Sequence, residues 1–137
     1  MKVTMTNGEI VTTVNRIIGM QNREEKQETK LFGERVKVTY AIKKNKEKLQ
    51  QLLKPYNESL DELIEKYKAE KPGEDGEPRI RKDCQKQWGD AVKELQEIEV
   101  EVDIHTVRFS EIEGLSLSLN DLEAIEFMLE EPEGFTE

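Results

Sequence analysis

A long stripe of apolar residues between positions 38 and 67 constrains the fold of this chain more than any other feature. Its members recur at alternating steps of about four and three residues, a spacing that places side chains on one face of a helix. They are Val38, Ile42, Leu49, Leu52, Leu53, Tyr56, Leu60, Leu63, Ile64 and Tyr67. Asn45 fills the one gap in the stripe. The pattern predicts about thirty residues of helix that pack against other helices, although alternation in residues 36–40 leaves a short strand as the alternative there.

Pro55 interrupts this stripe. Inside a helix, a proline removes one backbone hydrogen bond and its ring clashes with the preceding turn, so we expect a kink or a break at this point. Residues 71–78 hold two prolines and two glycines, which predicts a flexible loop at about residues 70–79. A second helix is expected over residues 80–97, and the two helical segments then form a long αα-hairpin. The apolar face of the second helix consists of Cys84, Trp88, Ala91, Val92, Leu95 and Ile98.

The residues before the hairpin predict a strand followed by a helix. Residues 2–6 alternate between apolar and polar and stop at an Asn-Gly pair. Helical spacing of apolar residues begins at Ile10, so we expect Asn7 to be the N-cap of a helix that ends near residues 19–20. Residues 21–30 are polar and are either a loop or a solvated extension of that helix.

The residues after the hairpin return to a period of two. Residues 100–104 predict a half-buried strand, and a change of phase predicts a bulge or bend near Thr106. The alternating leucines of residues 115–119 predict a second strand. A short terminal helix is expected to follow from Asn120 and to end at Pro132. The last residues, 132–137, then form a loose tail.

These patterns together predict an α+β fold with a single domain over residues 1–137. We expect the strand at residues 2–6 to join the two C-terminal strands in a small, mainly antiparallel sheet. The long helical hairpin would pack on that sheet or project from it, with one helix near each terminus.

Composition restricts the setting in which such a chain works. Cys84 is the only cysteine, so an intramolecular disulfide is excluded and a reducing compartment is favoured. The N-terminus has no apolar signal core, and no run approaches 18 apolar residues, the length of a membrane span. We therefore expect a cytoplasmic protein without a membrane segment.

The net charge of −9 conceals a strong asymmetry along the chain. Residues 1–93 carry 20 Lys+Arg and 16 Asp+Glu, whereas residues 94–137 carry 14 Asp+Glu and only Arg108. A rigid array of carboxylates can occupy a basic groove that binds a nucleic-acid backbone, and the alternative is a solvated acidic surface. The predicted partner-binding residues are Glu97, Glu99, Glu101, Asp103, Glu111, Glu113, Glu123, Glu126 and Glu130. Glu94, Glu131 and Glu133 belong to the same acidic region.

A basic segment within the long helix offers a second candidate surface. Its members are Arg35, Lys37, Lys43, Lys44, Lys46, Lys48 and Lys54. Such a patch can contact phosphates, with Tyr40 stacking on a base. On a helix these side chains point in several directions, and the whole chain is acidic, so direct nucleic-acid binding is disfavoured.

Residues suited to catalysis or to cofactor binding are few. His105 is the only histidine, and a set of His105, Asp103 and Ser110 can be named, but their spacing does not imply the geometry that activates a nucleophile. One Cys and one His cannot build a structural zinc site, and residues 74–77 lack the spacing of a calcium loop. No glycine-rich phosphate loop is present. We expect no cofactor, no metal and no enzymatic activity.

The order of four motifs resembles a family of small phage and prophage proteins of unknown function from Gram-positive bacteria. The motifs are MKVTMTNGEI at residues 1–10, KVTYAIKKN at 37–45, VEVDIH at 100–105 and LNDLEAIEFM at 119–128. The resemblance brings no catalytic residues and implies a viral setting, in which small acidic proteins inhibit host defence or assist virion assembly. The leading hypothesis is a binding protein that blocks a host protein. The alternative is a tail or capsid assembly protein that self-associates as a homo-oligomer through its long helices.

Overall fold

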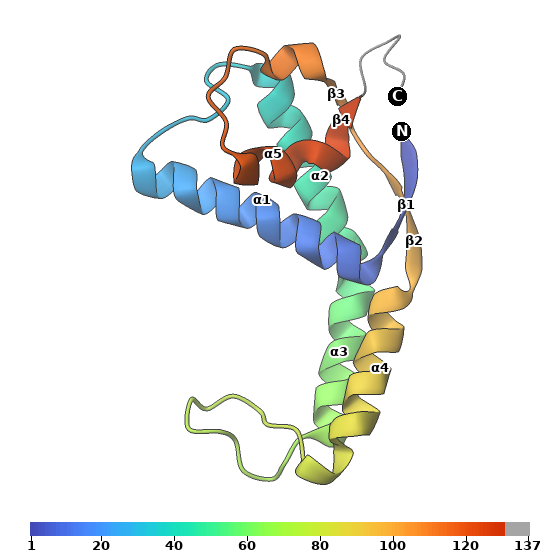
Figure 1. Cartoon of the computed structure of the whole chain (residues 1–137). Coiled ribbons are helices and arrows are strands. Elements are labelled where there is room, and N and C mark those ends of the chain that lie inside the picture. The colour runs from blue at the N-terminus through green and yellow to red at the C-terminus, as the bar shows by residue number, and fades with distance from the viewer. Residues whose placement is uncertain (131–137) are drawn as a thin grey trace.

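The computed structural model describes residues 1–130 and shows an α+β fold made of two unlike parts (Figure 1). We call residues 1–53 and 99–130 the head and residues 54–98 the arm. The elements are β1 (Lys2–Thr6), α1 (Asn7–Gln27), α2 (Val36–Leu52), α3 (Lys54–Tyr67), the 3-10 helix η1 (Lys82–Cys84), α4 (Gln85–Glu97), β2 (Glu99–Asp103), β3 (Val107–Arg108), η2 (Phe109–Ile112), α5 (Leu119–Ile125), η3 (Glu126–Met128) and β4 (Leu129–Glu130). The predicted fold class is confirmed. The predicted tail at 132–137 lies outside the described residues, as do Glu131 and Glu133.

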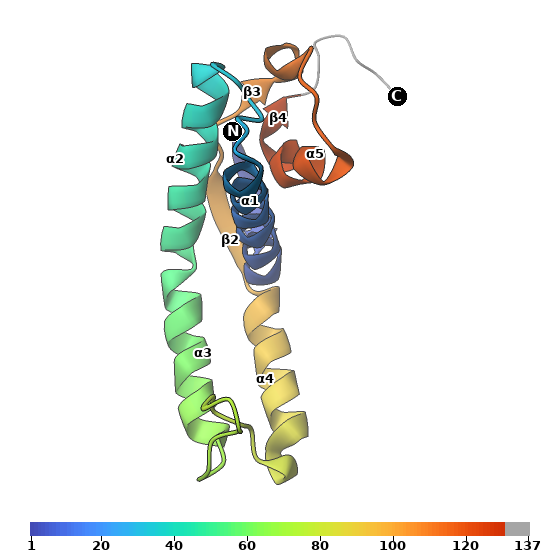
Figure 2. The ribbon, with the colours of Figure 1, turned by 90° about the vertical axis from the view of Figure 1, so that its left-hand side faces the viewer.

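The arm is the predicted helical hairpin, and it projects from the head rather than packing across the sheet (Figures 1 and 2). Helices α3 and α4 lie side by side, with the ring centroids of Tyr67 and Trp88 6.5 Å apart. Residues 70–79 form the predicted loop, and Lys68 and Ile80 form an isolated β-bridge at its base.

A break, not a kink, separates the two halves of the long apolar stripe. Helix α2 ends at Leu52 and α3 begins at Lys54, so Pro55 lies in the first turn of α3. A proline is tolerated there because the first amides of a helix have no partner within the helix. The two helices nonetheless follow each other almost in line (Figure 2). The alternative strand at residues 36–40 is wrong, because these residues form the first turns of α2.

Helix α1 differs at both ends from the expectation. Thr6, not Asn7, is the N-cap: its hydroxyl accepts a hydrogen bond from the Glu9 amide, and the Glu9 carboxylate accepts one from the Thr6 amide. Asn7 instead lies inside the helix, buried, and its side chain donates to the Leu95 carbonyl at 3.0 Å. This reciprocal capping box outcompetes a lone Asn cap because it satisfies two orphan amides.

The end of α1 lies beyond the predicted stop at residues 19–20. The helix continues to Gln27 and stops where Glu28 adopts a left-handed conformation, with φ of 53°. Met20 is buried and keeps the helix on the core, so the solvated extension is the correct alternative for the first part of residues 21–30.

The predicted three-stranded sheet is wrong. In the described residues β1 pairs only with β2, antiparallel, with Lys2 opposite Asp103 and Thr6 opposite Glu99. The chain leaves this ribbon after Asp103, and β3 pairs in parallel with β4 in a second small sheet.

The leucines of residues 115–119 form no strand. Leu115 and Leu117 pack on the core from an extended, irregular segment. Ser118 then caps α5, and its hydroxyl accepts a hydrogen bond from the Asp121 amide. The terminal helix is also shorter than expected: it ends at Ile125 and continues as the 3-10 helix η3. Alternation here reflects one-sided burial of an extended chain, which does not require a pairing partner.

The apolar core lies in the head, where α1, α2, α5 and the β1–β2 ribbon meet. Its fully buried side chains include Ile10, Ile17, Leu49, Val102 and Ile125. All residues of the arm are described, and among them only Tyr56 and Cys84 are buried. The core therefore fixes the surfaces of the head, whereas the arm keeps apolar side chains partly in solvent.

Candidate functional site

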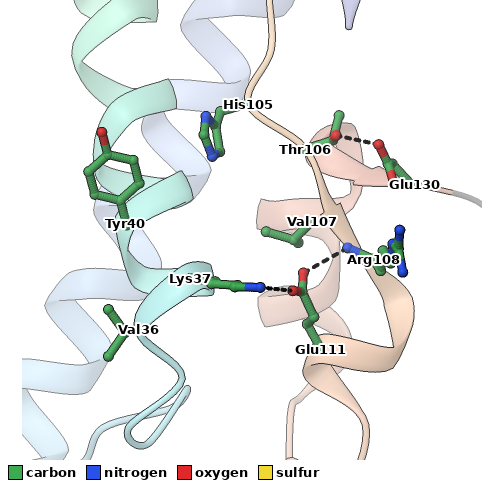
Figure 3. A pocket seen from close by; sticks show the side chains of 9 residues that line it. All are labelled: Val36, Lys37, Tyr40, His105, Thr106, Val107, Arg108, Glu111 and Glu130. Atoms are coloured by element: carbon green, nitrogen blue, oxygen red, sulfur yellow. Dashed lines mark hydrogen bonds and ion pairs between the residues drawn. The ribbon is translucent and has the colours of Figure 1, made fainter.

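A hollow of about 650 Å³ lies between the first turns of α2 and the strand β3 (Figure 3). We call it the groove. One wall comes from α2 and the other from the chain that leaves the β1–β2 ribbon after Asp103. Its lining residues are Val36, Lys37, Tyr40, His105, Thr106, Val107, Arg108, Glu111 and Glu130.

Helix α2 presents its groove side chains because its opposite face is committed to the core. Val38, Ala41 and Ile42 are buried, so the residues that fall between them point outward. Val36 is 74% exposed and Tyr40 is 50% exposed. Single exposed apolar side chains are common on protein surfaces, but these two line the same hollow, and clustered ones are typical of interaction sites.

An aromatic pair forms the centre of the groove. The rings of Tyr40 and His105 meet edge to face with centroids 5.5 Å apart, and Lys44 Nζ lies 6.0 Å from the Tyr40 ring centroid. Asn45 holds this arrangement from within the core. Its side chain accepts a hydrogen bond from the His105 amide at 2.8 Å and donates one to the His105 carbonyl at 2.8 Å. Because the backbone is fixed in this way, the imidazole is directed out of the core.

Charged side chains form the rim of the groove (Figure 3). Glu111 lies 4.0 Å from Lys37 Nζ and accepts a hydrogen bond from the Arg108 amide at 3.0 Å. On the other side, the Thr106 hydroxyl donates to the Glu130 carboxylate at 2.6 Å. The groove thus has an apolar and aromatic centre with charges of both signs around it.

The named set of His105, Asp103 and Ser110 is not assembled in the described residues. His105 packs on Tyr40, whereas the Asp103 carboxylate lies 3.2 Å from the N-terminal ammonium group and accepts a hydrogen bond from it. This ammonium group holds the pKa of Asp103 below its ordinary value.

The predicted partner-binding carboxylates lie in separate places. Glu99, Glu101 and Asp103 alternate along β2 with core-facing residues and are exposed, so they form one row on the outer side of the ribbon. The adjacent strand partly neutralises this row, since Lys2 Nζ lies 3.7 Å from Glu101. Glu97 precedes the row at the end of α4 and lines a hollow beside the start of α1.

The remaining predicted carboxylates lie on the C-terminal part of the head. Glu111 and Glu130 line the groove. Glu113 follows η2, and its carbonyl accepts a hydrogen bond from Arg35 at 2.8 Å. Glu123 and Glu126 are exposed on α5 and η3. The structure therefore brings together a row on β2 and a pair in the groove, not one continuous array.

The predicted basic segment is spread around α2. Lys46 Nζ donates to the Gln21 side chain at 2.7 Å, and Lys48 Nζ donates to the Asp103 carbonyl at 3.0 Å. Lys37 and Lys44 lie on the groove side with Tyr40. Only part of the segment thus shares a surface.

The groove is not among the surfaces that the sequence predicts. Tyr40 and His105 are distant in sequence and meet where Asn45 and core packing join α2 to the chain after β2. The available signal was the polar Asn45 within an apolar stripe, since a buried amide needs hydrogen-bond partners.

Within residues 1–130 no cluster of three or more His, Cys, Asp or Glu side chains could hold a metal ion. No helix in this part of the chain combines the length and the apolar character that crossing a membrane requires. Comparison of the chain with protein-family models, curated proteins and solved structures gave no match. The phage setting therefore stays a prediction that rests on the sequence motifs.

Proposed function

We propose that this protein is a non-catalytic binding protein that acts by covering a functional surface of a partner protein, and that the groove is its main contact site. The observation that carries the proposal is the exposed Tyr40–His105 pair beside Val36, with Phe109 exposed next to Arg108. Of the six large apolar side chains exposed in the described part of the chain, three are at or beside this hollow.

This composition matches the anatomy of protein interfaces. Such interfaces have an apolar or aromatic centre inside a polar rim, and Tyr and Arg are enriched among their energetically dominant residues. Tyr40 would be the anchor, and Lys37 and Arg108 would select a partner segment with acidic groups at its edge. The row of Glu99, Glu101 and Asp103 on β2 would attract a basic surface of the same partner, which makes association faster at low salt.

The family resemblance supplies the biological setting of the proposal. A phage protein of this kind would block a host factor, such as a nuclease or another defence protein, and a basic surface that binds nucleic acid is the kind of target that the β2 row fits. A role in virion assembly is the second candidate. It is favoured by the half-buried apolar side chains of the arm, which another protein surface could cover.

The groove is tested by capture of a partner from a host lysate and measurement of its affinity by calorimetry. Tyr40→Ala should weaken binding by about tenfold or more, as for an aromatic anchor. Leu119→Ala is the matched control, because Leu119 is 73% exposed on α5, away from the groove residues. Equal affinity of both variants and the wild type would exclude the groove as the contact site.

The β2 row is tested separately by its salt dependence. The double variant Glu99→Gln, Glu101→Gln should lower the association rate at low salt and have a smaller effect at high salt. The matched double variant Glu123→Gln, Glu126→Gln removes the same charge from α5 and η3 and should have less effect. If both variants lower the rate equally, only net charge matters. Turnover of a substrate that depends on a single buried polar residue would contradict the proposal as a whole.

A further inference from the structure

The helices of the arm have apolar faces like those of core helices, but these faces are only partly buried. Helix α3 has one buried residue, Tyr56, and α4 has none. Leu60, Leu63 and Leu95 are only partly buried, although they occupy the apolar faces of the two helices. Two helices alone can cover only one side of each other, so the rest of each apolar face remains in solvent.

The uncovered side chains gather in a hollow of about 560 Å³ between α3 and α4. We call its lining the arm face. It consists of Ser59, Glu62, Leu63, Lys66, Ala91, Glu94, Leu95 and Ile98. None of these residues belongs to α1, whereas Lys93 and Gln96 on another side of α4 line a hollow with α1 residues. The arm face therefore has an apolar centre and a charged margin, and no element among residues 1–130 covers it; Ile98 is 51% exposed.

We infer that the arm face binds the arm face of a second copy of this chain, with the two arms antiparallel in a four-helix bundle. Four helices can bury apolar faces that a two-helix hairpin leaves open. The inference deepens the second candidate function by naming the partner as another copy. It does not depend on the groove, which lies on the head.

The order of charges along the arm face favours another copy of this chain as the partner and an antiparallel arrangement of the two arms. Glu94 lies near the end of α4 that joins the head, and Lys66 lies near the end of α3 that leads into the loop. Antiparallel arms place Lys66 of each copy toward Glu94 of the other, whereas parallel arms would oppose like charges. The arm as a whole shows the same charge distribution, more acidic near the head than near the loop. Residues 54–64 and 88–98 carry two basic and six acidic residues, while residues 65–87 carry seven basic and six acidic ones.

The size of the arm face determines the expected affinity of the dimer. At about 1.5 Å per residue, α3 and α4 are each about 20 Å long, and side by side they are about 20 Å wide. Such a face lies at the low end of the areas that specific interfaces bury, so the dimer should exchange, with a dissociation constant on the order of micromolar.

Sedimentation equilibrium of the full chain, from about 1 to 500 μM, tests this directly and covers the expected range. The wild type should dimerise, and Ile98→Glu should raise the dissociation constant at least about tenfold. Leu119→Glu places the same charge at an exposed leucine of the head and should leave the dissociation constant unchanged. Circular dichroism establishes that both variants keep the fold. A wild type that is monomeric throughout, or a dimer insensitive to Ile98→Glu, would overturn the inference.

A charge exchange tests the antiparallel arrangement. Lys66→Glu alone and Glu94→Lys alone should each weaken the dimer, because each puts like charges opposite one another. An equimolar mixture of the two variants should recover wild-type dimerisation, since both contacts then pair opposite charges. Single variants as strong as the wild type, or a mixture that stays monomeric, would rule out this pairing. Tyr40→Ala should leave the dimer intact, so failure of the groove proposal and failure of this inference are distinguishable.

Discussion

The head and the arm share one apolar stripe but bury it to different extents. Leu49 in α2 and Leu63 in α3 lie fourteen positions apart on the same stripe, and both are leucines in regular helix. Leu49 is fully buried, whereas Leu63 is half-buried. The period of a sequence thus predicts that a helix has an apolar face, while the neighbouring elements decide whether that face is covered.

The difference arises from the number of elements that surround each helix. In the head, α1 and α5 pack on each other, α1 also contacts α2, and the β1–β2 ribbon adds buried residues such as Met5 and Val102. In the arm, α3 has α4 as its main neighbour. Stability should therefore be concentrated in the head, and the arm should contribute little unless another surface covers it.

The largest expected contrast is between the two leucines of the stripe. Leu49→Ala should lower the free energy of unfolding by about 2–5 kcal/mol, because it leaves a cavity in a closed core. Leu63→Ala should lower it by about 1 kcal/mol, because solvent already reaches that site. Urea denaturation at a protein concentration that keeps the chain monomeric measures both. Equal losses would show that the arm has a core of its own.

The next contrast is between a buried asparagine in the head and an exposed one in the arm. Asn45→Ala should cost about 2–3 kcal/mol, because it leaves the His105 backbone amide and carbonyl without their partner. Asn57→Ala, on the exposed side of α3, should change the free energy of unfolding by less than about 0.5 kcal/mol. A small effect of Asn45→Ala would mean that water replaces the amide, and would weaken our account of how the groove is held.

Ion pairs in the two regions should differ in how much they stabilise the fold. Burial raises the pKa of Asp121, but hydrogen bonds from Arg23 and Ser118 outweigh it, so the pKa is lowered on balance. The stabilisation that ionised Asp121 provides is thus fully present above the unfolded-state pKa of about 3.9. It is lost as the pH falls from there through the lower folded-state pKa. Asp121→Asn should reduce stability at pH 7 by about 1–2 kcal/mol, with a shrinking difference from the wild type toward low pH.

The arm offers a matched control for that ion pair. Glu65 and Lys68 lie 3.0 Å apart on exposed positions at the end of α3. Glu65→Gln should change stability by less than about 0.5 kcal/mol at pH 7, because solvent screens an exposed pair. Denaturation at several pH values compares the two variants. A pH-independent loss in Asp121→Asn would show that the folded state does not favour the ionised carboxylate, which contradicts the lowered pKa.

The smallest effect is expected at the junction between head and arm. Pro55→Ala should change the free energy of unfolding by less than about 1 kcal/mol, because proline at this position restricts the unfolded chain and breaks no helical hydrogen bond. Denaturation together with the helical signal in circular dichroism measures this. A loss above about 2 kcal/mol would show that Pro55 also holds the arm in place.

Local patterns predicted the elements better than their partners. The stripe at residues 38–67, the loop at 70–79 and the strand at 100–104 were recognisable because each depends on neighbouring residues in the chain. The N-cap of α1 is Thr6 and not Asn7, because Thr6 and Glu9 cap the helix together, and a pattern that scores single residues does not detect such a pair. The leucines of residues 115–119 show that alternation reports burial, and not pairing with another strand.

The candidate site was harder to predict, for a physical reason. Charge counts identify an acidic region, but they contain no information on which carboxylates share a surface. The structure divides the nine predicted ones between the end of α4, β2, the groove, the residue after η2 and the C-terminal helical turns. The groove depends on a long-range contact between α2 and the segment after β2. Only Asn45 hinted at it, because an amide in an apolar stripe has to be satisfied by something distant in the sequence.

The clamp made by Asn45 has a consequence for how the groove can change. The Asn45 side chain forms hydrogen bonds with the backbone amide and carbonyl of residue 105, and neither bond involves the side chain at that position. Position 105 can therefore exchange its imidazole for another group while the main chain stays anchored. One substitution at this position can therefore change what the groove binds while the packing of the core below it stays the same.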